Sequence, residues 1–89
     1  MEVTVYTKPG CMQCRATKAL MDRLGIEYDL IDISNSPGVA AFLQREGHKS
    51  LPVVFVDHDE YTDSWCGFRP DLIKQLRPFV GSGLLRASI

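Results

Sequence analysis

Cysteine is scarce in this chain, because only three of its 89 residues are cysteine. A small and odd number of cysteines is a poor framework for a secreted domain stapled by disulfides. An excess of charge of one sign is also missing, since 10 lysines and arginines face 11 aspartates and glutamates. Without a positive excess to neutralise a phosphate backbone or an anionic bilayer, we expect neither nucleic acid nor a membrane as a partner.

Long apolar runs are absent as well. None approaches the roughly 20 residues that cross a bilayer, and the first residues, Met1 to Tyr6, lack the basic and apolar regions of a signal peptide. We therefore expect a cytoplasmic protein. A reducing compartment keeps structural thiols open, so a cysteine pair there predicts catalysis or metal binding.

What is present is the composition of one globular domain. Hydrophobic residues make up 45% of the chain and charged residues 24%, which is typical of a packed protein. A chain of this length supplies one hydrophobic core. We predict a single domain over residues 1–78 and a flexible tail over residues 79–89, which begins near a Gly-Ser-Gly sequence.

Three segments rich in β-branched, aromatic and aliphatic residues predict β-strands, and they are residues 3–6, 28–33 and 51–56. Residues 61–64 could return as an edge strand. The third segment has Pro52 near its start, and a proline donates no backbone hydrogen bond to a sheet. A proline in an otherwise strand-like run therefore requires a specific reason.

Three segments predict helices, which begin at Met12, Pro37 and Pro70. In the first helix, Thr17, Leu20, Met21 and Leu24 recur at the spacing of one buried face, and Gly25 supplies a left-handed residue at the end.

The second helix has Ser36 as a cap hydroxyl and is expected to turn Val39, Phe42 and Leu43 inward. Pro78 is expected to end the third helix.

The predicted order is strand, helix, strand, helix, strand, strand, helix. A right-handed crossover makes the strands of a βαβ unit parallel, and a hairpin adds antiparallel strands. The sequence therefore predicts an α/β fold with a mixed four-stranded sheet and three helices that cover both of its faces.

Cys11 and Cys14 lie between the first strand and the first helix. If the helix begins there, free backbone amides and the helix dipole stabilise a thiolate at Cys11, and Lys8 and Arg15 add positive charge. We predict that the pKa of Cys11 lies below that of a free thiol. Cys14, one turn deeper, is predicted to be less exposed and to resolve a mixed disulfide formed at Cys11.

Two other interpretations of this cysteine pair remain open at this point. The thiols could form a buried structural pair, although a Pro-Gly turn places them at an exposed tip. They could also form half of a zinc site together with Cys66, His48 and His58, although structural zinc sites usually bring a second closely spaced ligand pair.

Three motifs carry a resemblance to known proteins. They are Cys11-Met12-Gln13-Cys14, Ser50-Leu51-Pro52-Val53-Val54 and Trp65-Cys66-Gly67-Phe68-Arg69-Pro70. Through them the chain resembles the thioredoxin and glutaredoxin superfamily over roughly residues 2–78, and more narrowly the NrdH-type redoxins, which are glutaredoxin-like proteins with thioredoxin-like activity. The resemblance implies a thioredoxin-like fold. It also implies a cis peptide bond at Pro52, which turns the backbone of Leu51 toward the dithiol so that an incoming chain can pair with it.

The resemblance implies a dithiol–disulfide oxidoreductase. Such proteins pass electrons to the large subunit of class Ib ribonucleotide reductase and are re-reduced by thioredoxin reductase, which uses NADPH. The implied redox group is the Cys11–Cys14 disulfide, with no bound cofactor or metal, in a monomeric protein. The positions implied to meet substrate or partner are Lys8, Met12, Gln13, Leu51, Pro52, Trp65, Gly67 and Phe68.

Alternative functions also follow from the resemblance. Glutaredoxins usually have Pro-Tyr between the cysteines and a Gly-Gly-x-Asp segment that holds the carboxylate of glutathione, whereas this chain has Met12-Gln13 and Trp65 to Pro70 at these places. We therefore expect weak glutathione binding, with a glutathione-dependent glutaredoxin as the alternative. A non-catalytic module that holds a metal or an iron–sulfur cluster on the same fold is a further alternative.

Two details of the third motif have two interpretations each. Trp65 and Phe68 either dock a partner or pack on the core. Cys66, expected in the loop before the last helix, is either a small packing residue or a thiol for a regulatory or intermolecular disulfide.

Overall fold

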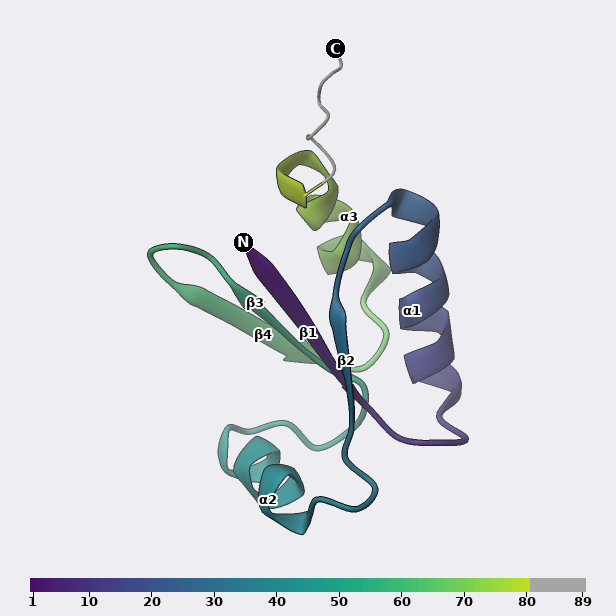
Figure 1. Cartoon of the computed structure of the whole chain (residues 1–89), viewed down its shortest axis with the longest axis vertical. Helices are drawn as coiled ribbons and strands as arrows, with labels where there is room; N and C mark the ends of the chain where they lie inside the picture. Colours follow the sequence, from purple (N-terminus) through teal and green to yellow (C-terminus); the bar gives the residue numbers. More distant parts are fainter. Residues whose placement is uncertain (81–89) are drawn as a thin grey trace.

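The computed structural model describes residues 1–80 of the chain, and its elements follow the predicted order (Figure 1). They are β1 (Glu2–Thr7), α1 (Met12–Leu24), β2 (Asp29–Asp32), α2 (Pro37–Arg45), β3 (Val53–Asp57), β4 (Thr62–Cys66) and α3 (Pro70–Val80). Residues 81–89 of the predicted tail lie outside the described residues, and residues 79 and 80 belong to α3. Within residues 1–80, no helix is long and apolar enough to cross a membrane.

The four strands form one mixed sheet in the order β2-β1-β3-β4. β1 and β2 are parallel, as the crossover through α1 requires. β1 pairs antiparallel with β3, and β3 pairs antiparallel with β4. The prediction of a mixed four-stranded sheet with three helices is confirmed.

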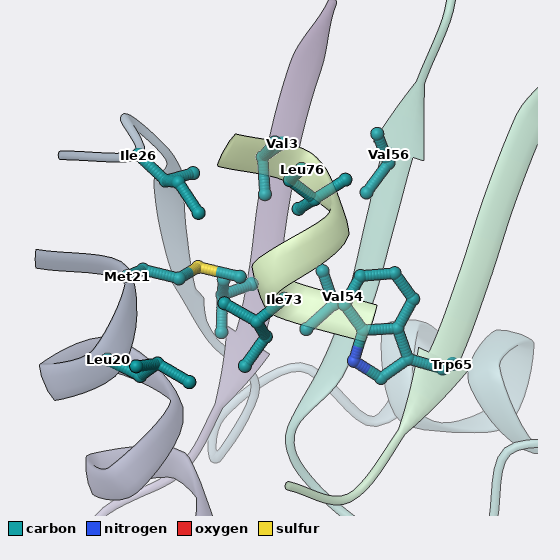
Figure 2. Packing of buried hydrophobic residues seen from close by; sticks show 10 residues of the cluster. Val3, Leu20, Met21, Ile26, Val54, Val56, Trp65, Ile73 and Leu76 are labelled. Carbon is teal, nitrogen blue, oxygen red and sulfur yellow. The ribbon is translucent and has the colours of Figure 1, made fainter. Parts of the chain in front are cut away.

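One face of the sheet is covered by α1 and α3, which lie against each other (Figure 1). Between these helices and the sheet lies a cluster of buried apolar side chains, to which α1, α3, β1, β3 and β4 contribute (Figure 2). The cluster consists of Val3, Val5, Leu20, Met21, Ile26, Val54, Val56, Trp65, Ile73 and Leu76. The alternating side chains of β1 and β3 point into it, which is the period-two pattern that the sequence predicts.

The other face of the sheet carries an aromatic cluster that α2 covers in part. Phe55 of β3 meets Tyr6 of β1 edge-on at a centroid distance of 5.7 Å and stacks against Phe42 of α2 at 6.3 Å. Leu43 is buried as predicted, but Phe42 is 40% exposed, so its predicted inward orientation is wrong in part. α2 has only 9 residues, so it covers too little of this face to bury the side chain of Phe42 as well as that of Leu43.

All four strands differ from their predicted bounds by one or two residues, and two of these differences have a structural cause. β3 begins at Val53, after Leu51 and Pro52, since a proline has no N–H for the ladder. β4 extends to Cys66, which pairs with Val53, so Cys66 ends a strand and does not lie in the loop before α3. The polar and exposed residues at the start of β4 give a weak strand signal, and pairing with β3 determines its length.

The helix ends also test the predictions. Gly25 ends α1 with a left-handed φ of 74°, as expected. Ser36 is the N-cap of α2, but its side chain makes no capping hydrogen bond. Pro78 does not end α3, which continues to Val80. A proline in the last turn removes a single N–H, and residues after it can still continue the helical conformation.

Candidate active site

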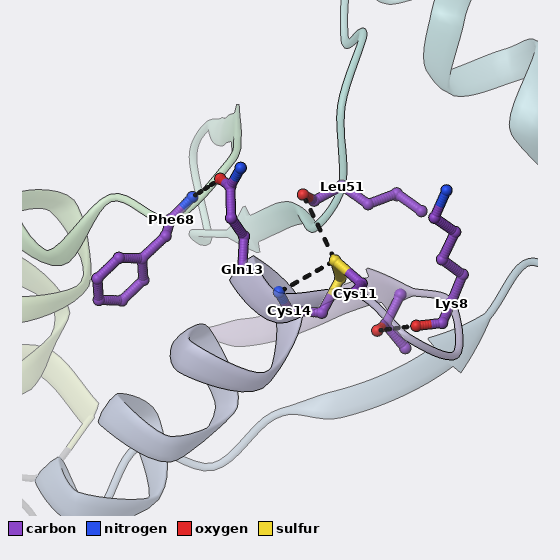
Figure 3. The surroundings of a disulfide bond; sticks show 7 residues. Lys8, Cys11, Gln13, Cys14, Leu51 and Phe68 are labelled. Atoms are coloured by element: carbon purple, nitrogen blue, oxygen red, sulfur yellow. Dashed lines mark hydrogen bonds between the residues drawn. A yellow bond between two sulfur atoms is a disulfide. The ribbon is translucent and has the colours of Figure 1, made fainter.

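Cys11 is the N-cap residue of α1, with an extended backbone (φ −93°, ψ 109°). The backbone N–H of Cys14 donates a hydrogen bond to the sulfur of Cys11 at 3.1 Å (Figure 3). The sulfur thus takes the place of the oxygen that usually caps a helix. The first turn of α1 contains no acidic residue. When the disulfide is reduced, the amides and the dipole of α1 therefore favour negative charge on the sulfur of Cys11.

The two cysteines of the motif form a disulfide bond, and their Cα atoms are 5.2 Å apart. Cys14 is 1% exposed and faces the core, whereas Cys11 is only partly buried. A disulfide substrate can therefore reach the sulfur of Cys11 more easily than that of Cys14. This difference agrees with the predicted roles of an attacking and a resolving thiol.

The segment before β3 contacts the dithiol from the opposite side. The Leu51–Pro52 peptide bond is cis, as predicted, and the carbonyl oxygen of Leu51 lies 3.7 Å from the sulfur of Cys11 (Figure 3). In the disulfide this is a contact without a proton, whereas a reduced Cys11 thiol can donate to the same carbonyl. A chain bound to Cys11 would therefore pass along the backbone of Leu51.

Gln13, between the two cysteines, connects α1 to the segment before α3. Its side-chain oxygen accepts a hydrogen bond from the backbone N–H of Phe68 at 2.8 Å (Figure 3). The neighbouring Gly67 has a left-handed φ of 82°, and its N–H donates to the carbonyl of Pro52 at 2.8 Å. These contacts bring the three sequence motifs together around the disulfide. The sequence did not indicate which atoms make them.

The remaining predicted site residues differ in exposure. Lys8, Met12 and Phe68 are exposed near the disulfide. Trp65 is 8% exposed and packs in the core cluster, so its side chain follows the packing interpretation and leaves little surface for a partner (Figure 2).

A groove of about 280 Å³ lies between α2 and the start of β3, and it borders the dithiol through Leu51, whose carbonyl contacts the sulfur of Cys11. Lys8, Lys49 and Leu51 line it together with the apolar side chains of Leu43 and Val53. Within residues 1–80, neither of the two lysines forms an ion pair. The sequence analysis missed Lys49, although its position directly before Ser50-Leu51-Pro52 could have indicated it.

Cys66 is half-buried and is the free cysteine of the chain. A hydrogen bond from the hydroxyl of Ser50 lowers the pKa of the Cys66 thiol, although burial opposes this effect. The backbone N–H groups of Lys49 and Ser50 and the charge of Arg69 lower the pKa further. Within residues 1–80, no group of three or more potential metal ligands forms, so Cys66, His48 and His58 do not complete a zinc site with the dithiol.

A cysteine pair at this helix terminus, facing a cis-proline segment, defines the class of thiol–disulfide oxidoreductases. The family model of glutaredoxin matches residues 3–60. The chain therefore belongs to the glutaredoxin family, among the NrdH-type redoxins, as the following relatives show.

The glutaredoxin-like protein NrdH of Escherichia coli K12 is 40% identical to this chain over 78 residues, which are 88% of this chain and 91% of the relative. The glutaredoxin-like protein NrdH of Lactococcus lactis is 32% identical over 74 residues, 83% of this chain and 97% of the relative. The solved structure of NrdH-redoxin from Escherichia coli has a TM-score of 0.76 at 41% identity and covers 85% of this chain and 95% of its own. The fold is therefore thioredoxin-like, as predicted.

Proposed function

We propose that this protein is a dithiol electron carrier that reduces disulfide bonds in protein substrates. The observation that carries the proposal is the asymmetry of the cysteine pair: Cys11 caps α1 at the surface next to the Leu51 backbone, and Cys14 lies buried behind it. A nucleophile needs access and a stabilised thiolate. A resolving thiol needs only proximity to the sulfur of Cys11.

The chemistry consists of two exchange steps. The thiolate of Cys11 attacks one sulfur of the substrate disulfide, forms a mixed disulfide and releases the other substrate sulfur as a thiolate. Cys14 then loses its proton to solvent, attacks the sulfur of Cys11 and releases the second substrate thiolate. Two electrons pass from the protein to the substrate, and the Cys11–Cys14 disulfide remains.

The proposed electron acceptor is the large subunit of class Ib ribonucleotide reductase, and the proposed electron donor is thioredoxin reductase, which uses NADPH. The similarity to NrdH-redoxin, a glutaredoxin-like protein with a thioredoxin-like activity profile, supports this assignment. We propose that the protein works as a cytoplasmic monomer and needs no bound cofactor or metal. The exposed side chains of Lys8, Met12 and Phe68 next to the disulfide are proposed to contact these partners, together with Gln13, Gly67 and the Leu51–Pro52 segment.

A comparison of two reducing systems tests the carrier function. Insulin reduction is followed with NADPH and thioredoxin reductase in one assay, and with glutathione and glutathione reductase in the other. We expect rapid turnover with thioredoxin reductase and slow turnover with glutathione. Cys11→Ser should abolish turnover, and Cys14→Ser should accumulate a mixed disulfide at Cys11. Rapid turnover with glutathione alone would contradict the proposed electron donor.

A reconstituted reaction tests the proposed acceptor. Deoxyribonucleotide formation by a class Ib ribonucleotide reductase is measured with NADPH, thioredoxin reductase and this protein. We expect product formation to depend on both cysteines, with Cys11→Ser as the inactive control. Product formation no faster than without the protein would contradict this acceptor while leaving the insulin result intact.

Two alternative functions make different predictions. Against glutathione binding, the backbone N–H of Phe68 is already bonded to Gln13 and is not free for a ligand carboxylate. A metal or iron–sulfur module would lose its function with a chelator, or show intense visible absorption after purification. The carrier should keep its turnover in the presence of a chelator.

A further inference from the structure

Thr17 of α1 has a buried hydroxyl group without a partner. The residue is 0% exposed, and within residues 1–80 its Oγ1 atom makes no hydrogen bond. A buried polar group without a partner destabilises the folded protein, so native proteins rarely contain one without a reason. The other buried threonine, Thr7, differs because its hydroxyl donates to the carbonyl of Lys8 at 3.5 Å.

Thr17 lies on the same helix face as Cys14, the buried cysteine of the dithiol. Cys14 and Thr17 are three residues apart and both belong to the buried face of α1. Side chains at this spacing are neighbours on one helix face. The indole N–H of Trp65 also lacks a partner within the described part of the chain, but it lies on β4 among the core side chains (Figure 2). Thr17 is therefore the unpartnered polar group on the helix that carries the redox pair.

The resolving step creates a need for a hydrogen-bond donor at this place. Cys14 must become a thiolate before it can attack the mixed disulfide, yet at 1% exposure its sulfur receives almost no water. Burial without a donor disfavours the charged form of a thiol. The amide of Cys14 points to the sulfur of Cys11, so it supports the attacking thiol and not the resolving one.

We propose that the hydroxyl of Thr17 donates a hydrogen bond to the sulfur of Cys14 when that sulfur becomes a thiolate in the resolving step. A threonine in a helix has two accessible χ1 rotamers, and rotation between them moves the hydroxyl without a change of backbone. Thr17 keeps its proton throughout, and the proton of Cys14 passes to solvent. In the disulfide the sulfur has no negative charge to bind, and the hydroxyl remains unpaired. The inference rests on the proposed function, because the resolving step belongs to it.

A two-phase reaction with a chromogenic aromatic disulfide, 5,5′-dithiobis(2-nitrobenzoate), tests this role. Reduced protein with Cys66→Ser as background is mixed with less than one equivalent of the reagent. The attack by Cys11 releases the first thionitrobenzoate anion, and displacement by Cys14 releases the second. The two rates are therefore read separately, without any reductase or ribonucleotide reductase.

The variants are Thr17→Val, which keeps the shape without the hydroxyl, and Thr17→Ser, which keeps the hydroxyl. We expect Thr17→Val to slow the second phase about tenfold, the order expected for a lost hydrogen bond to a charged group. The first phase should change less than about twofold, and Thr17→Ser should restore most of the second rate. Thr17→Val should also melt at an equal or higher temperature, because it removes an unpaired buried hydroxyl.

The inference is overturned if Thr17→Val resolves as fast as the parent protein. It is also overturned if Thr17→Val slows both phases together and melts at a lower temperature, because that result indicates packing alone. Should Thr17→Val fail to fold, Thr17→Ser and Thr17→Ala are compared in the same way. Absence of the first phase in the parent protein would instead contradict the proposed function.

Discussion

The two faces of the sheet differ in how completely they are covered. On one face, α1 and α3 enclose side chains such as Val5, Met21 and Ile73, which are 0% exposed. On the other face, α2 leaves Phe42 40% exposed beside Phe55. The enclosed face contains most of the buried apolar surface that stabilises the fold, and the open face contains the groove next to the disulfide.

The redox site combines residues from the enclosed face of the sheet with residues from the open face. Cys11 caps α1 and Cys14 lies in the first turn of this helix on the enclosed face, whereas Leu51 belongs to the connection between α2 and β3. The comparison teaches that the reactive thiols are held by the best-packed part of the molecule. The surface that a substrate chain would contact is built from the more open part.

Truncation of one side chain on each face tests this comparison most strongly. Met21→Ala should lower the free energy of unfolding by about 2–5 kcal/mol, because it leaves a cavity in the core. Phe42→Ala should lower it by only about 0.5–1.5 kcal/mol, the size of an aromatic pair contact. Urea unfolding followed by the fluorescence of Trp65 measures both. Equal losses in the free energy of unfolding would contradict this comparison, because they would show that both faces contribute equally to stability.

A smaller effect on stability is expected for Gly67→Ala, in the segment before α3 that contacts Gln13 and Pro52. The left-handed φ of 82° is strained for alanine, and the new Cβ would lie 3.1 Å from the side-chain oxygen of Gln13. We expect a loss of about 1–2 kcal/mol in the free energy of unfolding. Gly38→Ala in α2 is the matched control, because nothing lies within 4 Å of its Cβ. The control should be neutral or stabilising by about 0.5–1 kcal/mol, since alanine favours a helix. A similar loss in both variants would contradict this explanation.

Charge in the groove on the open face should have a modest effect on substrate choice. Lys49→Gln is expected to slow the reduction of an acidic peptide disulfide about two- to fivefold at low salt, because the groove loses a cation. Single-turnover rates with acidic and neutral peptides measure the change. Lys74→Gln on α3 is the control, since this exposed lysine does not line the groove. If the ratio of the rates with acidic and neutral peptides does not change, Lys49 does not contribute to substrate binding.

The smallest expected effect concerns Cys66 at the end of β4. The hydroxyl of Ser50 lowers the pKa of Cys66, so the reactive thiolate forms at lower pH than for an ordinary thiol. In the oxidised protein, Cys66 is the free thiol, and its alkylation by iodoacetamide can be followed against pH by mass spectrometry. The midpoint should lie below that of the same protein in urea, and Ser50→Ala should move it upward. Coincident midpoints in folded and unfolded protein would contradict this assignment.

Short-range features of the fold could be predicted because their causes are local. The strand before the dithiol, the cap position of Cys11 and the end of α1 at Gly25 depend on residues within a few positions of one another. The cis bond at Pro52 was implied by the resemblance of its motif. At the position that these local features predict, the structure has a disulfide bond between Cys11 and Cys14.

Contacts between distant segments could not be predicted in the same way. The hydrogen bond between Gln13 and Phe68, the pairing of Cys66 with Val53 and the place of Lys49 in the groove all join segments far apart in the chain. The role of Trp65 could not be predicted for the same reason. From the sequence, an aromatic residue beside a helix can pack on the core or dock a partner equally well. Its burial depends on the neighbouring elements.

The sequence by itself determined the order of the elements and the position of a thiol pair at the start of a helix, because periodicity, capping and turn residues act over one or two turns of chain. Only the tertiary structure decided that Gln13 bonds to the backbone of Phe68, that Trp65 packs in the core and which buried hydroxyl lacks a partner. These properties arise when side chains from separate elements compete for the same space and the same hydrogen bonds.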